Sequence, residues 1–123
     1  MTFLQKMRIL QDHIVDEHYT MTDKHLSIDY KEYASASEMS PADQELVSAA
    51  LEARNGSYSP YSHFQVGAAL RLSNGVIVKG ANQENAAYPS GLCAERTAMF
   101  AAGATYPEES IESVCRNLCR GFP

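Results

Sequence analysis

A short turn between two apolar stretches constrains the fold of this chain more than any other feature. Ser73-Asn74-Gly75 separates residues 65–72 from residues 76–79, and both stretches are rich in valine, leucine, isoleucine and alanine. An Asn-Gly pair accepts the positive φ angles that tight hairpin turns need. The sequence therefore predicts two antiparallel strands joined by a hairpin.

Helical patterns lie on both sides of this hairpin. A Ser-Pro-Ala-Asp sequence that begins at Ser40 combines a hydroxyl cap, a proline at the first helical position and an acid in the first turn. These signals predict a helix over residues 41–54, which Asn55-Gly56 ends. A second helical run begins near Cys93 and continues to Gly103.

The two ends of the chain carry weaker patterns. Apolar residues at helical spacing predict an amphipathic helix within 2–18, and alternation over 26–30 predicts a half-buried strand. Residues 110–114 could open another strand. We expect a helical N-terminal extension over 1–22 and one domain over 23–123. His13, His18 and His25 match no metal-ligand spacing and are interpreted as surface histidines.

Charge and composition exclude several classes of function. Ten basic residues against 15 acidic ones give a net charge of −5, which is not the footprint of a nucleic-acid-binding protein. No apolar run approaches the roughly 20 residues that span a bilayer. All three cysteines lie from position 93 onward, and Lys6 and Arg8 interrupt the early apolar residues. We therefore expect a soluble, cytoplasmic protein without a secretory leader.

Cys93 and Glu95 stand two residues apart at the predicted start of the second helix. The helix dipole favours negative charge there, so a thiolate and a carboxylate could hold a metal ion and a proton side by side. The alternative for each residue alone is a buried apolar thiol and a surface charge that complements the dipole.

Three groups of side chains are expected to converge on one place. The first is the aromatic loop 58–64, the second is the polar stretch 82–85, and the third is the Cys93 helix head. An aromatic ring offers a stacking surface to a planar base, while neighbouring amide and carboxylate groups suit hydroxyls. The combination indicates a heterocycle that carries a polyol, which is a nucleoside.

These groups carry a resemblance to a known family. Three motifs resemble the zinc-dependent cytidine deaminases of free nucleosides in order and spacing: Tyr58-Ser-Pro-Tyr-Ser-His-Phe64, Gly80-Ala-Asn82-Gln-Glu84-Asn85, and Leu92-Cys93-Ala-Glu95-Arg96. The resemblance covers about residues 40–103. It implies an α/β fold with three α-β-α layers and a mixed sheet, and subunits that assemble as a homotetramer.

The resemblance also implies roles for single residues. Cys93 would be a thiolate ligand of Zn²⁺, and Glu95 would relay protons from the zinc-bound water to the ring and the leaving ammonia. The remaining roles are listed by group: Phe64, Asn82, Glu84 and Ala94 would bind the substrate, Arg96 would support the zinc thiolates, and Ala86 and Tyr88 would contact a neighbouring subunit.

The C-terminal part departs from the family pattern, which places Pro-Cys-x-x-Cys on a later helix. Here Cys115 and Cys119 are separated by three residues and lack a preceding proline. We therefore expect a domain that lacks its C-terminal strands and helix, is incomplete after about residue 110 and leaves one sheet edge open. An alternative is that Cys115 and Cys119 share a helical face and serve as makeshift zinc ligands.

The resemblance implies hydrolytic, zinc-dependent deamination of cytidine or deoxycytidine to the uridine product and ammonia, a step of pyrimidine salvage. Two alternatives stay open. The chain could be a catalytically inactive nucleoside-binding remnant or assembly subunit, because two zinc ligands of the pattern are absent. It could also deaminate a nucleoside-like antibiotic of the blasticidin type. The expected partner is a small nucleoside, with no nucleic acid and no membrane.

Overall fold

The structure, a computed structural model, describes residues 23–120. The chain divides into two compact units, Met1–Lys31 and Glu32–Pro123. In the first unit, residues 23–31 adopt no helix or strand. The helix predicted within 2–18, with His13 and His18, lies outside the described residues, whereas His25 is exposed as expected.

The strand predicted over residues 26–30 is wrong. Leu26, Ile28 and Tyr30 are all more than three-quarters exposed, at 81%, 76% and 79%. Alternating apolar residues form a strand only where a neighbouring strand pairs with them and another layer covers their apolar face. Residues 23–31 have neither in the described part of the chain.

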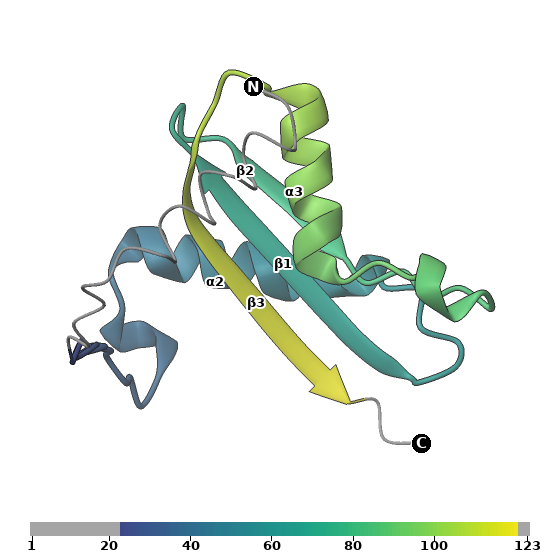
Figure 1. Cartoon of the computed structure of the whole chain (residues 1–123), viewed down its shortest axis with the longest axis horizontal. Coiled ribbons are helices and arrows are strands. Elements are labelled where there is room, and N and C mark those ends of the chain that lie inside the picture. Colours follow the sequence, from purple (N-terminus) through teal and green to yellow (C-terminus); the bar gives the residue numbers. More distant parts are fainter. Residues whose placement is uncertain (1–22, 121–123) are drawn as a thin grey trace, which may run out of the picture. The chain divides into compact units, whose positions relative to one another are not determined.

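The second unit is built on a sheet of three described strands (Figure 1). The central strand β1 (Phe64–Leu72) pairs with β2 (Ile77–Ala81) on one side and with β3 (Ile111–Arg120) on the other, and both pairings are antiparallel. The predicted hairpin is confirmed, because Leu72 N–H donates to the Val76 carbonyl at 3.0 Å and Gly75 has φ of 83°. The expected mixed sheet is not seen among these strands.

Helix α2 (Pro41–Ala53) covers one face of this sheet and confirms the prediction for residues 41–54. The Ser40 hydroxyl accepts from the Asp43 N–H at 3.2 Å and so satisfies one of the free donors of the first turn. Leu46 and Ala50 pack on Ala69 of β1. A short 3₁₀ turn, Arg54–Gly56, follows the helix.

Helix α3 (Ala94–Thr105) covers the opposite face of the sheet. Ala94, Ala98 and Ala102 recur every four residues and pack against the apolar side chains of β1. Gly80 permits the close approach, because a Cβ at that position would lie 2.4 Å from the Ala98 nitrogen. The sheet therefore lies between two helices, and the expected three-layer α-β-α arrangement is confirmed.

Strand β3 is longer than the sequence predicted, and it corrects one interpretation. The pattern indicated a strand only over residues 110–114, but the strand continues to Arg120. Cys115 and Cys119 therefore lie on a strand, in register with Ala69 and Gln65, and not on one face of a helix. No helix within residues 23–120 is long and apolar enough to cross a bilayer.

Candidate functional site

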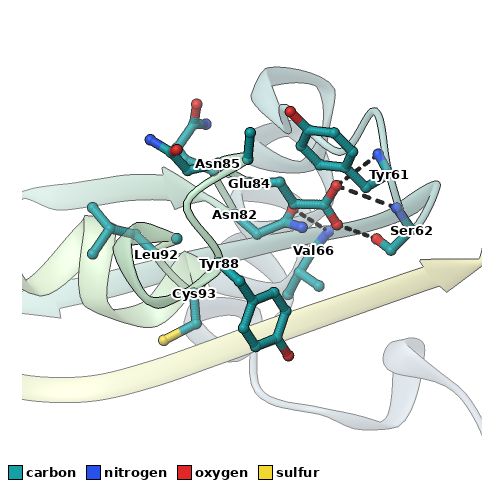
Figure 2. A pocket seen from close by; sticks show the side chains of 12 residues that line it. Tyr61, Ser62, Val66, Asn82, Glu84, Asn85, Tyr88, Leu92 and Cys93 are labelled. Carbon is teal, nitrogen blue, oxygen red and sulfur yellow. Dashed lines mark hydrogen bonds between the residues drawn. The ribbon is translucent and has the colours of Figure 1, made fainter.

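A pocket of about 710 Å³ lies at the head of α3 (Figure 2). Its walls come from the loop before β1, the loop after β2 and the residues that lead into α3. Tyr61, Ser62, Asn82, Glu84, Tyr88 and Cys93 are among the lining residues. The volume is within the range of small-molecule sites. The three groups predicted to converge are therefore brought together.

Backbone hydrogen bonds hold the three wall segments in fixed relation. Tyr58 N–H donates to the Asn82 carbonyl at 3.0 Å, and Glu84 N–H donates back to the Tyr58 carbonyl at 2.8 Å. Gln83 and Leu92 exchange two further bonds, at 2.9 and 2.8 Å. These bonds satisfy loop amides that would otherwise be unpaired, so the pocket walls are pre-organised.

The Glu84 carboxylate is anchored by the loop before β1. One oxygen accepts the backbone N–H groups of Tyr61 at 2.9 Å and Ser62 at 3.2 Å, and the other accepts the Ser62 hydroxyl (Figure 2). The hydroxyl bond is the main reason that the pKa of Glu84 is lowered, and the backbone bonds and nearby His63 lower it further. These three bonds use three of the about four acceptor positions of the fixed, ionised carboxylate, so one on Oε1 remains for a hydroxyl group of a ligand.

The Asn82 side chain is largely used within the protein. Its oxygen accepts the Ser57 hydroxyl at 2.5 Å and the Val66 N–H at 2.9 Å, while its nitrogen donates to the Phe64 carbonyl at 2.8 Å. An amide nitrogen has two hydrogens, so one donor is left for a ligand. Asn82 therefore lines the pocket and also links the first residues of β1 to the pocket wall through hydrogen bonds.

Cys93 caps the N-terminus of α3 and lines the pocket with an exposed thiol. Its carbonyl accepts from the Thr97 N–H at 3.0 Å and from the Thr97 hydroxyl at 3.2 Å. Glu95 lies in the first turn, where the structure pairs it with Arg116 of β3 at 3.0 Å. The predicted thiol and carboxylate therefore share one helix head, and Glu95 faces the sheet edge formed by β3.

Glu95 is not among the residues that line the pocket, and neither are Phe64, Ala94 and Arg96. Phe64 packs against the apolar cluster beneath α3. Ala94 is fully buried there, so only its backbone is available to a ligand. The Arg96 guanidinium lies 5.4 Å from the centre of the Phe100 ring, a cation–π contact on the outer side of the helix. Packing within the chain, and not contact with a ligand, accounts for the positions of Phe64, Ala94 and Arg96.

The predicted subunit-contact residues lie on the loop after β2. Ala86 and Tyr88 both line the pocket, and Tyr88 is 92% exposed (Figure 2). A tyrosine ring this exposed makes little apolar contact with its own chain and is available for contact with another molecule. The contact with a neighbouring subunit stays a prediction.

The described residues do not form a zinc site by themselves. Protein zinc sites use three or four side-chain ligands, and no group of three histidine, cysteine, aspartate or glutamate side chains is suitably placed among the side chains that the structure describes. Cys115 packs with Leu46, Ala50 and Ala69 beneath α2, on the face of the sheet opposite Cys93. Burial, helped by nearby Asp43, raises the pKa of the Cys115 thiol. Cys115 therefore does not join Cys93.

Sequence reasoning missed two contacts of this site. The aromatic loop includes Ser62, but the sequence did not predict its hydrogen bond to Glu84. The only signal for that bond is a hydroxyl in a loop expected to lie near a segment that carries a carboxylate. Arg116 was not linked to Glu95, because the predicted strand ended at residue 114 and so placed no side chain beside the helix head.

Together, the three layers, the thiol and carboxylate at one helix head and the carboxylate-lined pocket define an α/β domain with a candidate small-molecule site. Residues 5–117 match the family model described as the cytidine and deoxycytidylate deaminase zinc-binding region. The chain belongs to this family.

Individual relatives agree with this assignment. The chain is 56% identical over 59 residues to a cytidine deaminase of Halalkalibacterium halodurans and 49% identical over 59 residues to one of Sporosarcina psychrophila. Each match covers 48% of this chain, and it spans 45% and 43%, respectively, of the length of the relative.

Solved structures show the same likeness. The crystal structure of cytidine deaminase from Burkholderia pseudomallei superposes with a TM-score of 0.57 at 42% identity, over 63% of this chain and 61% of that one. That from Mycobacterium tuberculosis superposes with a TM-score of 0.58 at 35% identity, over 60% and 59%. The shared part thus covers about three-fifths of each chain.

Proposed function

We propose that the pocket binds cytidine or deoxycytidine. The observation that carries this proposal is the Glu84 carboxylate, which Ser62 and the Tyr61 amide hold in the pocket wall with one acceptor position left free on Oε1. A ribose hydroxyl is a suitable donor for that position, and the spare Asn82 N–H is a suitable donor to a sugar oxygen. The name of the family and of the related proteins supports a cytidine base.

The proposed reaction is hydrolytic deamination, which replaces the ring amino group by a carbonyl oxygen from water and releases ammonia. This exchange needs a group that takes a proton from water and returns it to the leaving nitrogen, and Glu95 is proposed for that role. Cys93 is proposed as the zinc ligand that this chain contributes. Because the side chains that the structure describes include no group of three zinc ligands, turnover would require ligands beyond those described.

A second candidate function follows from that observation. The chain could bind the nucleoside without converting it, because Glu84 and Asn82 are in place whereas the described side chains form no group of three zinc ligands. No contact in the pocket favours the third possibility, a nucleoside antibiotic, over cytidine. The two main candidates differ in ammonia release and zinc content, not in affinity.

The wider role is proposed from the family. We propose a cytoplasmic enzyme of pyrimidine salvage, assembled as a homotetramer in which Ala86 and Tyr88 contact a neighbouring subunit and Arg96 supports the thiolates. The exposed ring of Tyr88 supports the contact. We also propose that the deaminase domain spans residues 23–123 and that residues 1–22 are a separate extension.

One experiment tests the binding and the reaction separately. Calorimetry of the 123-residue chain with cytidine should show saturable binding, and Glu84→Gln should raise the dissociation constant by about tenfold or more, because a charged acceptor is lost. Glu45→Gln is the matched control, since Glu45 is an exposed acid on α2. Equal binding by the parent chain and Glu84→Gln would reject the proposed site.

The same samples then decide between the two candidate functions. Zinc content per chain is measured together with ammonia release from cytidine. Turnover that depends on zinc and is abolished in Glu95→Gln would support the deaminase. Cytidine binding without zinc and without ammonia release would instead support a nucleoside-binding chain.

A further inference from the structure

The loop that precedes β1 closes on itself through one backbone hydrogen bond. His63 N–H donates to the Ser59 carbonyl at 3.1 Å, so residues 59–63 form a single helical turn that does not continue. His63 has φ of 54°, and it is the one residue other than glycine with positive φ among those that the structure describes. A residue in this left-handed conformation ends a helical turn and reverses the chain, which here leads directly into β1 at Phe64.

This backbone conformation is uncommon for histidine. A side chain with a Cβ disfavours the left-handed region, although asparagine, aspartate and histidine adopt it more readily than other residues. The His63 side chain is exposed, so burial of the imidazole does not hold the backbone in this conformation. Unfavourable backbone angles persist where the surrounding contacts require them, and such residues concentrate at ligand sites. The contacts of the turn therefore show what the conformation achieves.

The turn directs its first N–H groups at Glu84. Pro60 has no N–H. The N–H groups of Tyr61 and Ser62 both donate to Glu84 Oε2, at 2.9 and 3.2 Å (Figure 2). The first N–H groups of a helical turn have no partner within the turn, so the Glu84 carboxylate serves as their acceptor. Because two N–H groups of one turn bond to one oxygen, the turn fixes the position of that oxygen.

The reversal of the chain at His63 also places the Ser62 hydroxyl. Its oxygen accepts the Phe64 N–H at 3.1 Å, while its proton is donated to Glu84 Oε1. The hydroxyl bridges these two groups because the chain folds back between Ser62 and Phe64, and His63 is the residue at which it does so. Both oxygens of the Glu84 carboxylate are therefore held by the turn that His63 closes, and one acceptor position on Oε1 is left for a ligand.

We propose that His63 is a positioning residue for the sugar of the nucleoside, and that it acts through its backbone. The left-handed conformation at His63 holds the N–H groups of Tyr61 and Ser62 on the Glu84 carboxylate, and so fixes the acceptor position that a sugar hydroxyl would use. This inference rests on the proposed function, because it assigns the sugar to Glu84.

The imidazole of His63 affects Glu84 less than the turn does. The Ser62 hydroxyl bond is the main reason that the pKa of Glu84 is lowered, the backbone bonds lower it further, and the charge of His63 has the smallest effect. A neutral residue that accepts positive φ should therefore replace His63. A β-branched residue should not, since positive φ is a genuine outlier for such a residue.

A substitution series at position 63 tests this role by calorimetry of the 123-residue chain with cytidine. His63→Asn and His63→Gly accept the left-handed conformation and should bind cytidine within about twofold of the parent chain. His63→Val should raise the dissociation constant by about fivefold or more, because a β-branched side chain leaves that conformation and opens the turn. His63→Ala disfavours positive φ less strongly, so it should show a smaller loss and replaces His63→Val if that variant does not fold.

Amide hydrogen exchange separates this role from a general loss of stability. In His63→Val, exchange at Tyr61 and Ser62 should accelerate at least about fivefold more than exchange at Leu70, which is buried in the middle of β1. A general loss of stability would accelerate exchange at all three amides alike. His25→Val is the matched control, since it removes an exposed histidine outside the turn, and it should change neither binding nor exchange.

Three results would overturn the role of His63. They are unchanged cytidine affinity in folded His63→Val and His63→Ala, equal losses in His63→Asn and His63→Val, which would assign the effect to the imidazole, and equal acceleration of exchange at all three amides. Failure of the proposed function is a different result, because Glu84→Gln would then bind cytidine as the parent does. A weakened Glu84→Gln beside an unchanged His63→Val would reject the role of His63 alone.

Discussion

The Nη1 nitrogen of Arg116 on β3 lies 3.0 Å from the Oε1 oxygen of Glu95 in the first turn of α3. The pair connects the outer strand to the helix head that lines the pocket. Arg116 is 55% exposed and Glu95 is 24% exposed, so solvent screens much of their attraction. The contact therefore orients the Glu95 carboxylate more than it stabilises the fold.

Removing this pair should cost little stability. Arg116→Ala is expected to lower the free energy of unfolding by less than about 1 kcal/mol, as for other exposed ion pairs. Urea denaturation provides the measurement. Lys79→Ala, which removes the exposed Lys79–Glu52 pair at 3.1 Å, is the matched control and should behave alike. A much larger loss for Arg116→Ala alone would contradict this assessment.

Two glycine-to-alanine changes around α3 should have opposite effects. Gly80→Ala would place a Cβ 2.4 Å from the Ala98 nitrogen and 2.6 Å from the Ala94 carbonyl oxygen, so α3 must move away from the sheet. A loss of about 1–3 kcal/mol or more is expected. Gly103→Ala meets no atom within 4 Å and should gain about 0.5–1 kcal/mol through helix propensity. Urea midpoints of the two variants, compared with the parent, test the sign of each.

Acid should remove the contribution of Glu84 to stability. The pKa of Glu84 is lowered in the folded chain, chiefly by the Ser62 hydroxyl. Between the folded pKa and the ordinary pKa of glutamate, the unfolded chain binds more protons than the folded chain. The contribution of Glu84 is therefore complete above roughly pH 4.3, the ordinary pKa, and is lost as the pH falls through the folded pKa.

The variant Glu84→Gln isolates this effect, because its side chain does not titrate. The stability difference between the parent and the variant should shrink as the pH is lowered from about 5 to about 3. Thermal unfolding at a series of pH values measures it, with Glu52→Gln as a control for an exposed acid. A difference that stays constant over this range would show that the Ser62 bond does not favour ionised Glu84.

The two described thiols should differ in reactivity. Cys93 is exposed, whereas Cys115 is half-buried beneath α2 and burial raises its pKa. Since the thiolate is the reactive form, a thiol reagent at about pH 8 should modify Cys93 at least about tenfold faster than Cys115. The measurement is made on the Cys119→Ser chain, and peptide mass spectrometry assigns the sites. After unfolding in urea, Cys93 and Cys115 should be modified at equal rates. Equal modification rates in the folded chain would instead place Cys115 at the surface.

Local signals were sufficient for much of the fold. The turn at Asn74-Gly75 predicted the hairpin, because only a few residue types accept its backbone angles. The cap at Ser40 predicted the start of α2, because hydroxyl, proline and acid act within one turn. The same reasoning failed for residues 26–30, where alternation was present but no partner strand or covering layer was available in the described part of the chain.

The pocket was predictable in content but not in detail. The sequence predicted that loop 58–64, residues 82–85 and Cys93 lie close together, and the structure confirms that they converge. The commitment of the Asn82 amide to Ser57, Val66 and Phe64 was not predictable. A sequence gives the hydrogen-bond donors and acceptors of each side chain. Which of them are bonded within the protein depends on the residues that folding brings close.

By itself the sequence determined the hairpin, the capped helix α2, the family and the identity of the residues at the pocket. These properties depend on backbone preferences and spacing within short segments. Only the tertiary structure decided that Cys115 lies across the sheet from Cys93, and that Arg116 meets Glu95. Both outcomes depend on the register of β3 against β1, since a shift of one residue would send every side chain of β3 to the opposite face.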